Sequence, residues 1–232
     1  MKGIFYGIGV GPGDPELLTI KGQRLLQEAD IIALPKTRGD KASTAWNIVK
    51  DLVGEKKLLD IIMPMTNNSQ VLQEAWQNGA ASIAEKLAEG YNVAFITLGD
   101  PSLFSTFNYL YQILLTKGYE AHIVPGINSP SATAAVLGCG LADGKENLII
   151  MPACDDLSSL AHELEEHDNL VLMKGAASWK DIAAILETYG DKISVSGVEL
   201  CGMENQRIFS SLQEIPLDGL SYFFTAIIRK DV

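Results

Sequence analysis

The chain has 232 residues, enough for one large domain or two compact ones, and 47% of them are hydrophobic, which is ample material for a core. Its formal net charge of −11 argues against nucleic acid as a partner, because contacts to phosphates need clustered Lys and Arg. An anionic ligand would therefore have to meet a local group of cations.

The apolar runs predict a cytoplasmic protein without a membrane partner. The run that follows Met1 breaks at Gly11-Pro12-Gly13, too early for a signal peptide. No apolar stretch reaches the roughly 18 residues that span a bilayer. The spacing of the metal-binding residue types predicts no metal site, and it leaves three free thiols. These are Cys139, Cys154 and Cys201.

The first half of the chain alternates strand and helix patterns. Short β-type runs are predicted at 3–10, 30–34, 58–63, 91–98 and 121–124. The longest helical pattern spans 69–89, and Gly90 follows it as a C-terminal cap. This alternation predicts a mostly parallel sheet that is covered on both faces.

After Pro125-Gly126 the pattern changes to a helix over 129–137 and then to closely spaced strands. The strands are predicted at 148–151, 169–173, 193–198, 206–210 and 221–228. Short connections suit antiparallel hairpins, so a mixed sheet is expected here. We predict two α/β domains, residues 1–125 and 126–232.

A glycine-rich segment, 7–15, follows the first predicted strand. It does not match a dinucleotide-binding Gly-x-Gly-x-x-Gly in either register, because Pro12 or Asp14 stands where the last glycine is needed. It does predict a stiff turn, with Asp14 as the cap of a helix that begins near Glu16. By itself, the segment is equally consistent with a turn that has no ligand.

Two further segments are rich in small residues. Segment 96–106 lies at the carboxyl end of an apolar strand, where ligands bind in open parallel sheets, and its Gly99 allows a ligand to approach the backbone. Segment 124–132 lies at the predicted domain junction, a common place for ligand clefts. A strand-to-helix turn and a linker are the alternative interpretations.

In this order and at these separations, the three segments resemble the signature of the tetrapyrrole methylases. That resemblance implies an enzyme that uses S-adenosylmethionine, with two α/β domains flanking a cofactor cleft. Met63-Pro64-Met65-Thr66, Ala75-Trp76 and segment 99–106 are similar to the members that methylate C-20 of a cobalamin precursor. The resemblance further implies a homodimer, and it favours cobalt-factor II over metal-free precorrin-2 as substrate.

Three alternatives remain open at this point. The chain could methylate another position of a tetrapyrrole, or it could be a methyltransferase similar to diphthine synthase, which acts on a modified histidine. The alternating α/β pattern alone would also suit a non-catalytic nucleotide-binding module.

The resemblance also implies which residues contact the cofactor. The matching positions are Pro12, Leu98, Gly99, Asp100, Leu103, Asn128, Ser129, Met173, Cys201, Gly202, Thr225 and Ala226. The implied chemistry is displacement of a methyl group from a sulfonium by a ring carbon, with orientation as the main catalytic effect. We assign no catalytic residue. The cations expected to meet the carboxylates of the substrate are Lys36, Arg38 and Lys41.

Overall fold

The computed structural model describes residues 1–37, 43–152 and 157–230. Arg38, Lys41 and Cys154 lie outside the described residues. The chain divides into two compact units, Met1–Asn128 and Ser129–Val232. This division and the expected boundary after residue 125 both fall between the last strand of the first unit and the helix that follows it.

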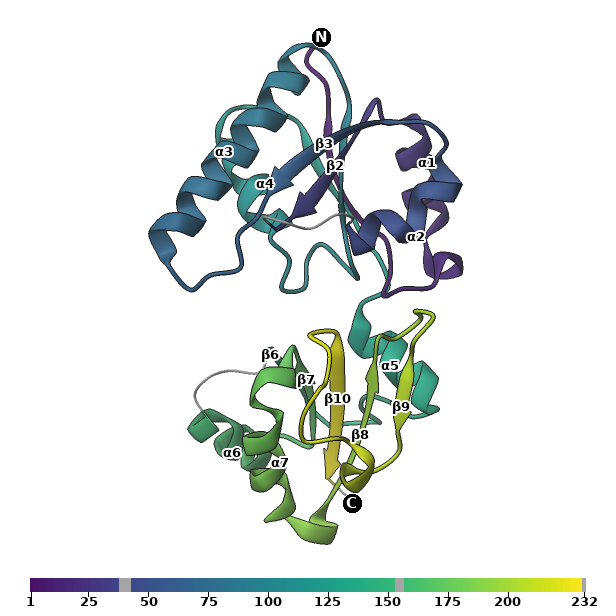
Figure 1. The fold of residues 1–232 in the computed structure, drawn as a ribbon, viewed down its shortest axis with the longest axis vertical. Coiled ribbons are helices and arrows are strands. Elements are labelled where there is room, and N and C mark those ends of the chain that lie inside the picture. The colour runs from purple at the N-terminus through teal and green to yellow at the C-terminus, as the bar shows by residue number, and fades with distance from the viewer. Residues whose placement is uncertain (38–42, 153–156, 231–232) are drawn as a thin grey trace. The chain divides into compact units, whose positions relative to one another are not determined.

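The first unit contains a parallel sheet with helices on both faces (Figure 1). Within the described residues its strands have the order β3-β2-β4-β1-β5, and every pairing is parallel. This confirms the predicted parallel sheet. The elements are β1 (Phe5–Gly9), α1 (Ile20–Glu28), β2 (Ile31–Lys36), α2 (Thr44–Val53), β3 (Lys57–Ile62), α3 (Ser69–Ala88), β4 (Val93–Thr97), α4 (Phe107–Thr116) and β5 (Ala121–Val124).

Both faces of this sheet are buried at the central strands β2 and β4, because these strands have apolar residues at successive positions. Ile31 and Ala33 of β2 belong to the core formed with α3 and α4. Ile32 and Leu34 belong to the core formed with α1 and α2. Figure 1 shows the two helix pairs on opposite sides of the sheet. The carboxyl ends of the strands, and the loops that follow them, therefore lie along one edge of a rigid layer.

The start of the first helix differs from the sequence-based expectation. Asp14 does act as a cap, since its Oδ1 accepts a hydrogen bond from Glu16 N at 2.8 Å. However, the turn that it caps is a short 3-10 helix, Pro15–Leu17, which ends because Leu18 is extended. Helix α1 begins only at Ile20, where Thr19 Oγ1 accepts from Gly22 N at 3.0 Å.

The second unit contains a mixed sheet of order β6-β7-β10-β8-β9 in the part of the chain that the structure describes. Strands β6 and β7 are parallel and the other pairings are antiparallel, which confirms the predicted mixed sheet. The elements are α5 (Ser129–Leu137), β6 (Leu148–Pro152), α6 (Leu157–Glu166), β7 (Asn169–Met173), α7 (Trp179–Glu187), β8 (Ile193–Glu199), β9 (Arg207–Phe209) and β10 (Phe224–Lys230). Helices α6 and α7 cover one face and α5 the other.

Candidate functional site

The loops after β1 and β4 are joined through their backbones. Gly99 N donates to Gly11 O at 2.7 Å, and Gly11 N donates to Gly99 O at 3.3 Å. Gly99 has a φ of 71°, in the left-handed region that favours glycine. The first two glycine-rich segments therefore meet at the carboxyl edge of the sheet, the edge at which open α/β sheets bind ligands.

The loop after β5 packs against the same backbone. A Cβ at Gly126 would lie 2.3 Å from Gly99 O, and a Cβ at Gly9 would lie 2.6 Å from the same oxygen. Both distances are far below an ordinary contact, and the atoms that would clash are backbone atoms. Three strand ends thus meet at a place that only glycine can occupy, which we call the glycine cradle (Gly9, Gly99 and Gly126).

Asp100 connects the cradle to the loop before α4. Its Oδ2 accepts from Gly126 N at 2.8 Å, and its Oδ1 accepts from Ser102 N at 2.7 Å and from the Ser102 hydroxyl. Its exposed fraction is 9%. Both carboxylate oxygens are engaged by these donors, so Asp100 fixes two of the signature segments relative to each other.

The sequence-predicted residues of the second unit gather at one edge of its sheet. Strand β7 ends at Met173, which pairs with Thr225 near the start of β10. Strand β8 is antiparallel to β10 and ends at Glu199, opposite Phe224. The hydroxyl of Thr225 donates to Ser129 Oγ at 3.4 Å. Met173, Ser129, Thr225 and the loop after β8 therefore lie at the same edge.

The loop after β8 has an unusual backbone. Leu200 and Gly202 have φ values of 54° and 73°. Gly202 N donates to Gln206 Oε1 at 2.7 Å, and Leu200 N donates to Phe223 O at 3.1 Å. Burial raises the pKa of the Cys201 thiol above its ordinary value, so this residue acts as a small packing group.

Glu199 holds this loop in place, and the sequence analysis did not identify it. Glu199 is 3% exposed, and its carboxylate accepts hydrogen bonds from Arg207 Nε and from Ser221 N. The hydrogen bond from Arg207 holds the pKa of Glu199 below its ordinary value. Glu199 thus connects the end of β8, just before Cys201, to Arg207 of β9 and to Ser221, which lies shortly before Thr225.

Replacing Glu199 with Gln is expected to lower the free energy of unfolding by about 1.5 kcal/mol, because a buried charged hydrogen bond is lost. The pKa of Glu199 is lower in the folded protein than in the unfolded chain. The ionised carboxylate therefore stabilises the fold fully when the pH is above the unfolded-state pKa. This stabilisation is lost as the pH falls through the folded-state pKa. The difference between Glu199→Gln and the unchanged protein should therefore shrink in acid.

Urea unfolding at several pH values measures this difference. Glu28→Gln is the matched control, since Glu28 and Arg24 form a 2.9 Å pair in which both side chains are more than half exposed. That pair should contribute only about 0.3–0.5 kcal/mol. Equal effects of the two substitutions, or an effect of Glu199→Gln that grows in acid, would contradict the role assigned to Glu199.

The structure distributes the predicted cofactor residues over the two units. In the first unit Leu98, Gly99, Asp100 and Leu103 lie in or beside the loop after β4, Pro12 lies in the loop after β1, and Asn128 follows β5. In the second unit Ala226 is fully buried in the core on the side of α6 and α7. A ligand at this edge could therefore contact only the backbone atoms of Ala226.

Of the three predicted substrate-binding cations, Lys36 is described. It ends β2, and its Nζ lies 2.9 Å from Asp60 Oδ2. The exposed fractions of the two side chains are 19% and 51%. Lys36 therefore lies at the carboxyl edge of the sheet, as expected, with a carboxylate of the neighbouring strand as its partner.

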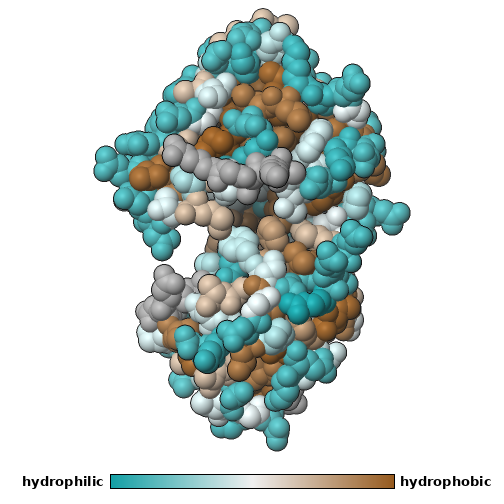
Figure 2. Space-filling view, in the orientation of Figure 1, coloured by the Kyte–Doolittle hydropathy of each residue, from teal (hydrophilic) through white to brown (hydrophobic). Residues whose placement is uncertain are grey.

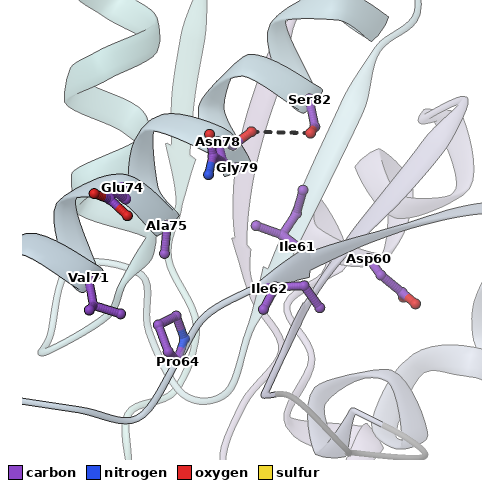
Figure 3. Close-up of a pocket in the computed structure, with 10 residues that line it drawn as sticks. All are labelled: Asp60, Ile61, Ile62, Pro64, Val71, Glu74, Ala75, Asn78, Gly79 and Ser82. Carbon is purple, nitrogen blue, oxygen red and sulfur yellow. Dashed lines mark hydrogen bonds between the residues drawn. The ribbon is translucent and has the colours of Figure 1, made fainter.

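A pocket of about 440 Å³ lies between α3 and the edge strand β3 (Figure 3). Ile61, Ile62 and Pro64 line one side. Apart from Val71, the residues of α3 that line the pocket are small or polar (Figure 3). These are Glu74, Ala75, Asn78, Gly79 and Ser82. Pro64 and Ala75 come from two of the three segments that resemble the C-20 methylases.

Within residues 1–37, 43–152 and 157–230, no group of three or more His, Cys, Asp or Glu is placed to hold a metal ion. In the same part of the chain, no helix is long and apolar enough to cross a membrane.

Comparison with known proteins gives consistent matches over the whole chain. The family model described as tetrapyrrole (corrin/porphyrin) methylases matches residues 5–216. A probable cobalt-precorrin-2 C(20)-methyltransferase of Methanocaldococcus jannaschii is 34% identical, over 97% of this chain and 95% of the relative. The cobalt-precorrin-2 C(20)-methyltransferase of Salmonella typhimurium is 32% identical, over 99% and 98%. A precorrin-2 C(20)-methyltransferase of a Sinorhizobium species is 26% identical, over 97% and 95%.

Solved structures share the fold. A cobalt precorrin-4 methyltransferase superposes with a TM-score of 0.75 at 19% identity, covering 97% of this chain and 94% of the other. A uroporphyrin-III C-methyl transferase of Thermus thermophilus, complexed with S-adenyl homocysteine, gives 0.69 at 21% identity, over 98% and 97%.

Proposed function

Because this chain belongs to the tetrapyrrole (corrin/porphyrin) methylases, we propose that it transfers a methyl group from S-adenosylmethionine to C-20 of a cobalamin precursor. The observation that carries the proposal is its similarity, over nearly the full length of both chains, to two relatives named as C(20)-methyltransferases. A non-catalytic nucleotide-binding module is not favoured by these matches. Methylation at another ring position is kept as an outcome of the test below.

The residues at the two sheet edges fit a cofactor that is held through backbone groups. The glycine cradle has no room for a side chain at Gly9 or Gly126, and Asp100 accepts a hydrogen bond from Gly126 N. In the second unit, Met173, Ser129 and Thr225 lie at one edge beside the loop that Glu199 fixes. We assign these groups to S-adenosylmethionine, which supplies a methyl group on a positively charged sulfur when it is bound.

The chain contributes orientation. Backbone hydrogen bonds and Asp100 hold the cradle, and Gln206 holds the loop after β8. The groups that these segments present are therefore fixed before a ligand binds. Asp100 has both of its oxygens engaged by backbone and hydroxyl donors, and we therefore assign it a structural role. Transfer to a ring carbon is then favoured by alignment of the ligands, and we assign no general base.

Lys36 is proposed to meet a carboxylate of the substrate. Its pair with Asp60 is partly exposed and is worth at most about 1 kcal/mol, so a substrate carboxylate can replace Asp60. Arg38 and Lys41, which follow in the sequence and lie outside the described residues, are proposed for the same role.

Lys36→Met should raise the KM for the tetrapyrrole about tenfold, the equivalent of one charged hydrogen bond, and leave the Kd of S-adenosylmethionine unchanged. Asp60→Asn, which frees Lys36, should not raise the KM. Lys57→Met is the control, because Lys57 lies at the opposite end of β3, with its Nζ 5.0 Å from the Tyr91 ring centroid. Equal KM values for Lys36→Met, Lys57→Met and the unchanged enzyme would refute the assignment.

Cobalt-factor II is the substrate that we favour. The two relatives at 34% and 32% identity are named for the cobalt-containing substrate, whereas the relative at 26% is named for precorrin-2. The test gives purified enzyme and labelled S-adenosylmethionine each substrate in parallel under anaerobic conditions. A faster initial rate with cobalt-factor II supports the proposal. A clearly faster rate with metal-free precorrin-2 overturns the choice of substrate, and the C-20 reaction remains.

A homodimer is proposed as the assembly. Four large apolar residues of the β3–α3 region are 43–72% exposed, and Figure 2 shows hydrophobic residues gathered over β3. They are Leu58, Ile62, Met65 and Val71. Light scattering that gives the mass of one chain at all concentrations would contradict this proposal. The cytoplasmic location stays a prediction, to be tested by cell fractionation.

A further inference from the structure

Trp76 of α3 and Tyr109 of α4 form a parallel ring stack at the surface of the first unit. Their ring centroids are 3.7 Å apart and the planes differ by 5°. The core ring pair Phe5–Phe107 is instead tilted by 30°. Trp76 packs against the core, whereas Tyr109 is 48% exposed. The stack therefore has a half-buried layer, Trp76, and a more exposed layer, Tyr109.

This stack adjoins the loop of the predicted cofactor residues. Helix α4 begins directly after that loop, and Tyr109 N donates to Thr106 O at 3.2 Å. Asn108 Nδ2 donates to Pro101 O at 3.0 Å, which bonds the first turn of α4 to the loop. Tyr109 is therefore anchored to the segment that contains Asp100.

Phe104, in the same loop, is exposed and has a strained backbone, which is a second observation that suggests a ligand. It is 42% exposed and has a φ of 48°, a conformation that side chains other than glycine rarely adopt. Such strain is typically found where a ligand is bound. A large apolar ring is thus presented to solvent by a strained backbone, in the loop that leads into α4.

We propose that Trp76 and Tyr109 form a stacking surface for the flat ring system of the tetrapyrrole substrate, and that Phe104, in the loop before α4, is a further exposed ring on the same unit. The inference rests on the proposed function for its ligand class. A tetrapyrrole presents an extended π-face, and the exposed ring of a parallel aromatic stack is complementary to such a face. The pair would orient the ring system while cations such as Lys36 bind its rim.

The test measures the equilibrium Kd of the tetrapyrrole and of S-adenosylmethionine separately, by calorimetry. Tyr109→Ala should weaken tetrapyrrole binding about tenfold or more, the size of an effect seen for ring stacking on aromatic side chains, and leave S-adenosylmethionine binding unchanged. Tyr109→Phe keeps the ring and should bind as the unchanged enzyme does. Leu115→Ala is the control, an apolar residue of α4 that is 39% exposed and lies on a different side of the helix.

The two proposals fail in different ways. If the unchanged enzyme does not bind a tetrapyrrole, the proposed function is wrong. If it binds one, and Tyr109→Ala binds it equally well, or weakens it no more than Leu115→Ala does, the stacking surface alone is wrong. Weaker S-adenosylmethionine binding in Tyr109→Ala would also overturn the inference, since the stack would then serve the cofactor. Thermal unfolding of each variant checks that α3 and α4 remain packed.

Discussion

Replacing Gly126 with Ala is expected to lower the free energy of unfolding by about 3 kcal/mol and to abolish binding of S-adenosylmethionine. The new Cβ would lie 2.3 Å from Gly99 O and 2.7 Å from Gly9 C. Both are backbone atoms at the ends of buried strands, so they cannot move aside as a flexible side chain would. The three strand ends would separate, and the cradle would lose its shape.

Gly140→Ala is the control for this experiment. A Cβ there would lie 3.2 Å from Asp143 Oδ1, the end of a side chain that can rotate, so only a small change in stability is expected. Denaturant unfolding and calorimetric titration with S-adenosylmethionine measure both quantities. A Gly126→Ala protein that binds the cofactor normally would show that the cradle is not part of the cofactor site.

Asp100→Ala should also lower the free energy of unfolding by about 3 kcal/mol, and it should weaken S-adenosylmethionine binding by at least about tenfold. The substitution removes the acceptor for two backbone donors, Gly126 N at 2.8 Å and Ser102 N at 2.7 Å. Each unsatisfied donor in this 9% exposed position is taken to cost about 1.5 kcal/mol. The loops after β4 and β5 would then no longer be fixed to each other.

Asp14→Ala is the matched control, because Asp14 accepts from a single backbone donor, Glu16 N, in an exposed turn. Loss of such a cap should lower the free energy of unfolding by about 1 kcal/mol. The same two measurements apply. Equal effects of Asp100→Ala and Asp14→Ala on stability would argue against the structural role of Asp100, and unchanged cofactor affinity would argue against its place in the site.

The sheets could be predicted because their strands have clear sequence patterns. In β4 and in the first five positions of β2, every residue is apolar or small, as expected when both faces of a parallel sheet are covered. Strands β8 and β9 are separated only by residues 200–206 and pair antiparallel, whereas β10 comes after a longer connection and pairs antiparallel with β8 and β7. Helix α3 ends close to the predicted position, where Gly90 has a φ of 93°.

Two helices of the second unit were not predicted, although their sequences contain the signal. Leu157, Leu160 and Leu164 follow helical spacing in α6, and the last two are buried. In α7, Trp179, Ile182 and Leu186 do the same. The start of α1 was placed too early because Asp14-Pro15 is a good initiation signal, and nothing local reveals that the chain becomes extended at Leu18.

The loops of the candidate site could be found from glycine and proline patterns, but their partners could not. Glu199 and Ser221 are 22 residues apart, and their hydrogen bond exists only because β8 and β10 pair in one register. The same holds for the approach of Gly126 to Gly99 across the sheet edge. Such contacts follow from tertiary structure, and a single sequence does not specify them locally.

The position of the transferred methyl group tests the account most directly. Purified enzyme is incubated anaerobically with cobalt-factor II and S-adenosylmethionine that has an isotope-labelled methyl group, and the label in the product is located by NMR. We expect a single labelled methyl group, bonded to C-20. Label at any other ring carbon, or no transfer to the tetrapyrrole by enzyme that binds both ligands, would contradict the proposed function.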